Sequence, residues 1–228
     1  MRHSSAAHCG LSFHRALWSQ RAVCCSVLGL CSYAPVLHAA EDARAGAAET
    51  SAERRSGFTF GVAGGLLTSS ARGYPNDVDK IDVRQYEAHS GLGVNVGGAL
   101  WIGGALADWL NVGVGMIGGG IQRDGLRSGG AAFNVRVETF PLFYRGGPFR
   151  DLGVLLTAGT GGYNIERGKD KLAEGAGTSA VGLGAFYEPW RLWQFSFGPQ
   201  LEYNYQFSDS ISAHTFVLGV RTVFYGGP

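Results

Sequence analysis

Strict alternation of apolar and polar side chains across residues 193–207 is the feature that most constrains the fold. The odd positions read WFFPLYYF and the even positions read QSGQENQ. Successive side chains of a β-strand point to opposite faces, whereas the side chains of an α-helix repeat about every 3.6 residues. The segment is therefore predicted to be a strand with one apolar face, which carries aromatic residues at both ends, and one polar face.

Seven further segments alternate in the same way with varying clarity, at residues 57–67, 91–102, 110–117, 131–143, 152–163, 178–187 and 212–225. Eight strands of this length suit a bilayer crossed at a tilt. Charged residues are only 16% of the chain, against about a quarter in soluble domains, and glycine is abundant. The sequence therefore predicts an all-β protein, a single closed eight-stranded antiparallel up-and-down transmembrane β-barrel.

Residues 1–40 are predicted to be a signal peptide. Arg15 and Arg21 precede an apolar run at residues 22–37, and small residues follow, which is the order of a secretory signal. Two alternatives are a short membrane anchor and a lipoprotein modified at Cys31, although Leu30 is bulky for the residue before a lipidated cysteine. All four cysteines lie in the first 31 residues, so cleavage would leave neither a disulfide nor a cysteine-bound metal.

Residues 41–56 contain no large apolar side chain and are predicted to form a disordered periplasmic tail. Residues 57–228 then form the outer-membrane β-barrel domain. The first 40 residues hold three of the 19 basic residues and none of the 18 acidic ones, so the remainder has 16 basic and 18 acidic residues, a net charge of −2. No basic patch indicates a nucleic-acid partner.

The connections between the predicted strands differ in length. If the N-terminus is periplasmic, the first and third outward connections, residues 68–90 and 166–177, are long and charged. The inward connections are short, at residues 103–109, 145–151 and 188–192. Long outward loops and short inward turns are typical of outer-membrane barrels, although the fourth outward connection, residues 208–211, is short.

In its predicted signal peptide, its eight alternating segments and its last strand, the chain resembles the small outer-membrane barrels typified by OmpA and OmpX. The resemblance covers residues 57–228. Apolar residues alternate up to Phe224, similar to the signal read by the barrel-assembly machinery, but four more residues follow it. The resemblance implies outer-membrane lipid and that machinery as partners and a location in the bacterial cell outer membrane. It implies no particular activity.

The predicted inner face carries two acids and two bases, namely Arg136, Glu138, Glu202 and Arg221. An unpaired buried charge is costly, so we expect Arg136 to lie within salt-bridge distance of Glu202 or Glu138. Eight strands enclose an interior just wide enough for side chains to fill. These four residues are therefore predicted to close the lumen, and the alternative is that they line a gate or a narrow solute path.

Enzymes with this fold modify lipids and need a nucleophile with a histidine base. Beyond residue 40 only His89 and His214 remain. His214 shares a strand face with Ser212, but no family motif surrounds the pair, and we predict no catalytic residue.

One acidic cluster could bind calcium through oxygen ligands, at Asn76, Asp77, Asp79 and Asp82. It lacks the glycine and the terminal glutamate of an EF-hand loop. The cluster is therefore predicted to be a solvated loop, and we expect neither a metal nor a cofactor.

The favoured function is that of an integral outer-membrane protein with a structural or surface-interaction role, whose exterior ligand the sequence does not identify. A small or gated solute channel is the alternative, and a lipid-modifying barrel enzyme is a further one. The alternative fold is a secreted β-sandwich, which would bury the apolar faces and expose Glu202.

The signal-peptide prediction can be tested on the membrane-purified protein. Cleavage after Ala39 or Ala40 predicts a mature chain that begins near Ala40 or Glu41, because signal peptidase cuts after small residues. N-terminal sequencing measures this directly, and an intact Met1 would contradict the prediction.

Overall fold

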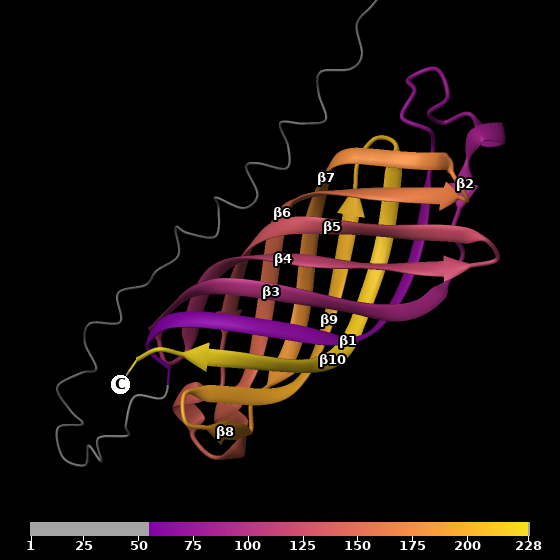
Figure 1. Cartoon of the computed structure of the whole chain (residues 1–228). Helices are drawn as coiled ribbons and strands as arrows, with labels where there is room; N and C mark the ends of the chain where they lie inside the picture. The colour runs from indigo at the N-terminus through magenta and orange to yellow at the C-terminus, as the bar shows by residue number, and fades with distance from the viewer. Residues whose placement is uncertain (1–54, 228) are drawn as a thin grey trace, which may run out of the picture. The chain divides into compact units, whose positions relative to one another are not determined.

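The computed structural model describes residues 55–227, so the predicted signal peptide and most of the predicted tail lie outside the described residues. Eight long strands form the wall of a barrel: β1 (Gly57–Gly73), β3 (Gly93–Ala107), β4 (Leu110–Arg123), β5 (Leu126–Thr139), β6 (Leu152–Arg167), β7 (Asp170–Tyr187), β9 (Phe195–Phe207) and β10 (Ile211–Tyr225). Each is antiparallel to the next, and β10 pairs with β1 to close the barrel (Figure 1). The predicted all-β, eight-stranded closed fold is confirmed.

Short elements lie at the two ends of this wall. β2 (Ala88–His89) pairs with β1, and β8 (Trp190–Leu192) pairs with β9. Three 3-10 helices lie in the connections: η2 (Arg84–Tyr86), η3 (Phe143–Arg145) and η4 (Pro148–Asp151). No helix within residues 55–227 is long and apolar enough to cross a membrane.

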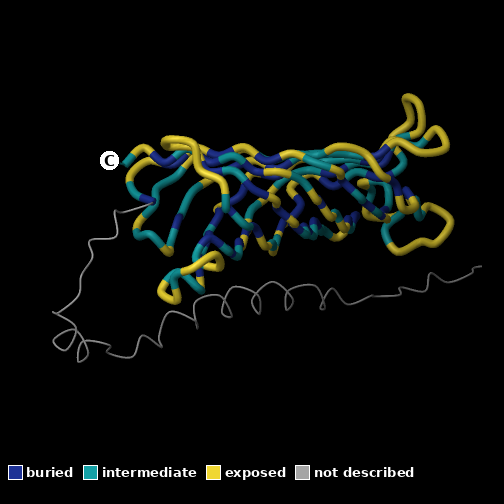
Figure 2. Tube along the Cα trace, turned by 90° about the horizontal axis from the view of Figure 1, so that it is seen from below, coloured by how far each residue is buried: buried dark blue, intermediate teal, exposed yellow. Residues whose placement is uncertain are grey.

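Side chains alternate between the lumen and the exterior as the sequence predicts. On β9, Leu201 is 51% exposed on the outer face, whereas Glu202 is 1% exposed inside the barrel. Phe195 is also exposed, and Phe197 and Tyr203 are half-buried on the same outer face. Figure 2 shows buried and exposed positions alternating along the strands. A β-sandwich would bury Leu201 and expose Glu202, so that alternative is wrong.

The start of β1 and the end of β10 pair side by side at one end of the barrel (Figure 1). We call this the inner end, following the predicted periplasmic N-terminus, and the opposite end the outer end. The long connection of residues 74–92, which contains η2 and β2, lies at the outer end. The sequence predicts a long outward loop at residues 68–90, whereas β1 extends to Gly73 and takes its first six residues.

The predicted long loop at residues 166–177 is wrong. β6 continues to Arg167 and β7 begins at Asp170, so only Gly168 and Lys169 connect them, and Gly168 has a φ of 63°. Charged side chains do not prevent strand pairing where they lie on a face that meets water, and here Lys171 pairs with Glu174 at 2.9 Å.

The other connections also depart from the predicted alternation of long and short. β4 and β5 join through Asp124 and Gly125, whose φ values of 51° and 76° are those of a tight type I′ hairpin. At the inner end, the connection between β5 and β6 holds η3 and η4, and that between β7 and β9 holds β8. Two inward connections are therefore longer than the hairpins at the outer end.

Glycine on the inner face makes room for one large aromatic side chain. Trp101 points into the lumen and is 3% exposed. A Cβ added to Gly61 would overlap the Trp101 indole ring, whereas a Cβ added to Gly64 on the outer face has no atom nearer than 3.8 Å. The close approach of β1 to this indole therefore requires glycine at position 61.

A matched pair of valine substitutions tests this packing. Gly61→Val should destabilise the barrel by about 1–3 kcal/mol, because the indole must move in a filled lumen, whereas Gly64→Val should leave stability nearly unchanged. Urea unfolding of each variant in lipid vesicles measures the difference. Equal stability of the two variants would show that Trp101 does not pack against β1 in this way.

Candidate functional site

The structure brings together the four charged residues that the sequence predicts inside the barrel. Arg136 Nε donates a hydrogen bond to Glu138 Oε1 at 2.6 Å, and Arg136 Nη1 lies 3.5 Å from Glu202 Oε2. Arg221 Nη2 donates to Glu138 Oε2 at 2.8 Å. Glu138 therefore bridges two arginines from different strands, β5 and β10, with one carboxylate oxygen for each.

Three more charged residues extend this cluster toward the inner end. Arg221 Nε lies 3.1 Å from Glu188 Oε1, close enough for an ion pair although not aligned as a hydrogen bond. Arg55 Nε lies 3.6 Å from Glu188 Oε2, and Arg55 Nη2 donates to Asp151 Oδ1. We call these seven residues the lumen network: Arg55, Arg136, Glu138, Asp151, Glu188, Glu202 and Arg221.

The three added residues lie outside the barrel strands. Arg55 precedes β1, Asp151 ends η4, and Glu188 follows β7. Arg55 belongs to the segment that the sequence assigns to the tail, yet it is only 2% exposed, and its backbone N–H donates to Asp108 Oδ1 at 2.8 Å. Alternation reveals which way a side chain faces only within a strand, so it gave no signal for these connection residues.

Aromatic rings cover the arginines where hydrogen-bond partners run out. The Arg221 guanidinium carbon lies 3.8 Å from the Phe186 ring centroid and 5.0 Å from that of Trp101, while Arg221 Nη1 has no hydrogen-bond partner. The Arg136 guanidinium lies 4.1 Å from the Trp101 ring. A cation over an aromatic face is attracted to the ring quadrupole. This attraction partly replaces the hydration that an exposed guanidinium would receive from water.

Polar neutral side chains complete the lumen network. Tyr225 Oη donates to Glu188 Oε2 at 3.0 Å, and Asn111 Nδ2 lies 3.3 Å from Tyr225 Oη. Gln200 Nε2 donates to Glu202 Oε2 at 2.6 Å, and Asn204 Nδ2 donates to Glu202 Oε1 at 3.1 Å. Glu202 therefore depends less on its arginine than Glu138 does.

The buried charges among the described residues are three arginines and four carboxylates. Burial raises the pKa of the Glu188 carboxyl above its ordinary value, although Arg221 and Arg55 both act to lower it. One proton on Glu188 would balance the network. Because the folded-state pKa is raised, this protonation stabilises the fold fully below the ordinary pKa, and the contribution disappears as the pH rises through the folded-state value.

Apolar side chains fill the lumen toward the outer end. One buried cluster consists of Ala71, Tyr163, Ile165, Ala173, Ile211 and Ala213. A second, of Leu67, Ile121 and Val217, lies on the inner faces of β1, β4 and β10. A cavity beside Leu67 and Tyr163 has a volume of about 20 Å³, and one beside Trp101 and Arg136 about 10 Å³. Each is at most the size of a single water site.

The two histidines occupy positions unrelated to the lumen. His214 lies on the outer face of β10, where the Tyr203 hydroxyl is 2.8 Å from its Nδ1 and the Tyr205 ring stacks on it at 4.7 Å. Ser212 shares this outer face, as the sequence predicts. His89 Nε2 lies 3.4 Å from Glu87 Oε1 in the long connection. Both imidazoles therefore face aromatic or acidic neighbours rather than a nucleophile.

Within the acidic cluster of residues 76–82, Asp77 finds its partners in the loop itself. Asp77 Oδ1 accepts a hydrogen bond from the Asp79 backbone N–H at 3.2 Å, and Asp77 Oδ2 pairs with Lys80 at 2.8 Å. The hydrogen bond from Lys80 holds the pKa of Asp77 below its ordinary value. Within residues 55–227, no group of three histidine, cysteine or acidic side chains is arranged to hold a metal ion.

Solved structures share this architecture. The sequence matches no family model and no curated protein. Neisserial surface protein A is 9% identical, with a TM-score of 0.50, over 73% of this chain and 96% of that one. The fold is that of a small bacterial outer-membrane β-barrel. Ail of Yersinia pestis (14% identity, TM-score 0.44, 73% and 98% coverage) and OprG of Pseudomonas aeruginosa (11%, 0.40, 75% and 98%) are also similar.

The exterior of the barrel carries many exposed apolar side chains. Phe60, Leu100, Phe133, Leu183 and Leu218 are among the large apolar side chains that it exposes. Exposed apolar area on this scale marks a surface that another apolar phase covers, and lipid is that phase for an outer-membrane barrel. We call this surface the apolar belt.

Removal of the bridging carboxylate tests the lumen network. Glu138→Ala should destabilise the barrel by about 3–5 kcal/mol, because it leaves two arginines buried without their shared partner. Glu202→Ala should cost less, since Glu202 contacts one arginine at the longer distance of 3.5 Å. Unfolding by urea in lipid vesicles measures both losses.

Glu174→Ala is the matched control, because Glu174 and Lys171 form an exposed ion pair. Exposed pairs contribute about 0–1 kcal/mol. If Glu138→Ala were no more damaging than Glu174→Ala, Glu138 would not hold the network together.

Proposed function

We propose that this protein is a non-enzymatic integral outer-membrane barrel with a closed lumen, whose role is structural or lies in the surface that it presents outside the cell. The observation that carries this proposal is the filled lumen. Ion pairs occupy its inner half. Apolar side chains and the hydrogen-bonded hydroxyls of Ser69, Ser128 and Tyr163 occupy its outer half, and the cavities beside Leu67 and Trp101 measure only about 20 and 10 Å³. A hydrated ion or solute needs far more room than a single water.

The outer end supports a surface role, because its long connection is fixed in place. Ser90 N–H donates to the Ala71 carbonyl, and Ser90 Oγ accepts from the Ala71 N–H at 2.8 Å. Tyr74 N–H donates to the Ser210 carbonyl, and the Tyr74 carbonyl accepts from Glu174. Residues 75–87 are thus presented on an anchored base, which lowers the ordering entropy that a partner's binding would otherwise cost.

We propose no enzymatic role because His214 and Ser212, the candidate catalytic pair, are not placed for catalysis. His214 and Ser212 point away from the lumen, and Tyr203 and Tyr205 already surround the imidazole. Nucleophilic catalysis requires a base that reaches the nucleophile. For assembly, we expect the barrel-assembly machinery to recognise β10, whose outward apolar residues end at Phe224.

Conductance across a planar bilayer tests the closed lumen. The refolded wild-type protein should insert without producing conductance steps, because side chains fill the lumen along its length. Insertion is checked independently by protease protection and by the altered gel mobility of a folded barrel. Reproducible steps from wild-type protein would contradict the closed lumen and would favour the channel alternative.

A further inference from the structure

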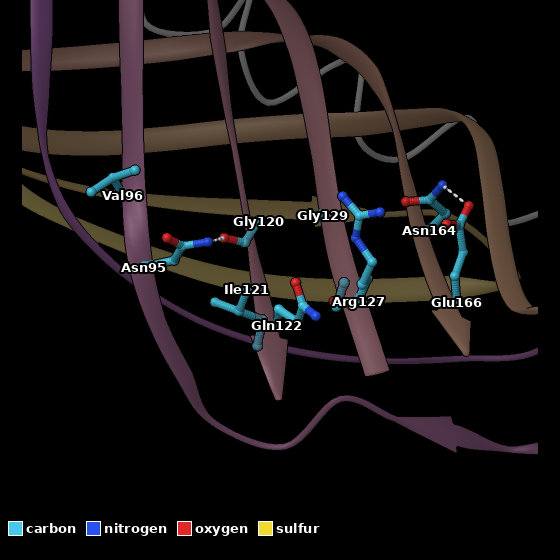
Figure 3. A pocket seen from close by; sticks show the side chains of 10 residues that line it. Asn95, Val96, Gly120, Ile121, Gln122, Arg127, Gly129, Asn164 and Glu166 are labelled. Carbon is cyan, nitrogen blue, oxygen red and sulfur yellow. Dashed lines mark hydrogen bonds between the residues drawn. The ribbon is translucent and has the colours of Figure 1, made fainter. Parts of the chain in front are cut away.

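A hollow of about 420 Å³ lies on the barrel wall near its outer end, where β3, β4, β5 and β6 run side by side. β3 and β4 pair only as far as Gly97 and Gly119. Beyond that point Asn95 reaches across with its side chain, and its Nδ2 donates to the Gly120 carbonyl at 2.9 Å. Figure 3 shows this contact on one side of the hollow and the Asn164–Glu166 pair on the other. We call this feature the outer hollow.

The strand register arranges the exterior of β4, β5 and β6 in rows. The row nearest the outer end is polar and consists of Gln122, Arg127 and Glu166. The next row inward is Gly120, Gly129 and Asn164. These positions share the exterior face with the exposed side chains of Met116, Phe133 and Leu156, because successive residues of a strand alternate. The outer hollow is therefore a feature of the outside of the barrel.

A row of small residues separates these polar rows from the apolar belt. It consists of Gly118, Ala131 and Gly162, and the row below it is Met116, Phe133 and Thr160. Met116 is 50% exposed and Phe133 is 53% exposed. Along the wall from the outer end, the surface thus changes from charged and amide groups to bare backbone and then to apolar side chains.

The glycines in and beside the hollow are of two kinds, since Gly120 and Gly129 line it and Gly118 lies in the next row inward. A Cβ on Gly120 or Gly129 would meet backbone atoms of the neighbouring strand at about 2.8–3.0 Å, so the close approach of β4 and β5 requires glycine there. A Cβ on Gly118 would find its nearest atom at 3.5 Å, which is an ordinary contact. Packing within the chain therefore does not require Gly118, and the space above it is available to an external group.

Arg127 is the unpaired cation of the outer hollow. Its side chain is exposed and forms no ion pair with the described residues, although Glu166 is its neighbour in the row. Glu166 Oε1 instead accepts from Asn164 Nδ2 at 2.7 Å. Figure 3 shows Arg127 between Gln122 and the Asn164–Glu166 pair. Arg127 therefore lies between the Gln122 amide and the Glu166 carboxylate. This arrangement suits a ligand whose phosphate or carboxylate reaches the guanidinium and whose hydroxyl groups meet Gln122 and the Asn164–Glu166 pair.

We propose that the outer hollow binds an outer-leaflet lipid whose headgroup is both anionic and hydroxylated, such as a phosphorylated glycolipid. The phosphate contacts Arg127, the hydroxyls meet the Gln122 amide and the Asn164–Glu166 pair, and the acyl chains lie over Met116 and Phe133. The position of the hollow next to the apolar row favours a lipid over a soluble saccharide, because only a lipid has acyl chains that can cover Met116 and Phe133. The proposal rests on the membrane location of the barrel but not on its closed lumen.

Lipid binding to the refolded full-length mature chain tests this proposal. The probes are diphosphorylated lipid A, its dephosphorylated form, and the soluble phosphorylated glucosamine disaccharide without acyl chains. Native mass spectrometry counts the molecules bound per barrel. Arg127→Gln should lower the affinity for diphosphorylated lipid A about tenfold, which is typical of losing one charge-assisted contact. Gly118→Leu, which places a large side chain in the row between the hollow and the apolar belt, should lower it similarly by blocking the path of the acyl chains.

Matched variants elsewhere on the outer face serve as controls. Arg72→Gln removes another exposed arginine at the outer end, and Gly64→Leu fills another outward glycine whose nearest atom would be 3.8 Å from the added Cβ. Both should bind lipid A as the wild type does. Arg127→Gln and Gly118→Leu probe the hollow by independent routes, so a folding defect in one leaves the other informative.

Three results would overturn the proposal. Equal binding of diphosphorylated lipid A by the wild type, Arg127→Gln and Gly118→Leu would show that the hollow is not the site. Equal binding of the dephosphorylated form would remove the role of Arg127. Equal binding of the soluble disaccharide would make the ligand a free saccharide instead of a lipid. Because none of these measurements uses conductance, their failure is distinguishable from failure of the closed lumen.

Discussion

Glu138 pairs with two almost fully buried arginines, and the interior of the barrel is arranged around that carboxylate. The barrel itself follows from the membrane, since a sheet in lipid must close on itself to satisfy its backbone hydrogen bonds. Closure with eight strands leaves a lumen that side chains must fill. Charges placed there must find partners inside the wall, and Glu138 provides one oxygen to Arg136 and the other to Arg221. The rings of Trp101 and Phe186 then fill the space beside those guanidinium groups.

The same packing explains which lumen contacts could be predicted from the sequence and which could not. The apolar and polar faces of β9 could be read directly, because lipid on one side and a narrow lumen on the other leave no freedom to invert them. The expectation that Arg136 would pair with Glu202 or Glu138 followed from the cost of a buried charge. Arg55 and Glu188 could not be found in this way, since they lie in connections whose path depends on the folded barrel. Trp101 interrupts a run of small inward residues, and its site exists only because Gly61 lies opposite.

The hairpin between β6 and β7 shows a different limit of alternation. A charged segment such as residues 166–177 indicates contact with water, but it does not distinguish a loop from a strand that extends beyond the membrane. The backbone of an antiparallel hairpin satisfies its own hydrogen bonds, and the charged side chains then face water on the exterior. Charge therefore indicates that the segment meets water at one end of the barrel, but it does not give the conformation of the segment.

Glycine has different structural roles on the inner and outer faces of the barrel wall. On the inner face it admits a neighbour of the same chain, as Gly61 admits Trp101, and replacement should cost stability. On the outer face Gly118 admits nothing from the chain, so its replacement should cost little stability while changing what the wall can contact. The lumen network lies toward the inner end, whereas the outer hollow faces outward beyond the apolar belt. A substitution at Glu138 should therefore change the free energy of unfolding without changing lipid affinity, and a substitution at Arg127 should do the reverse. The two effects are independent because the residues share no partners.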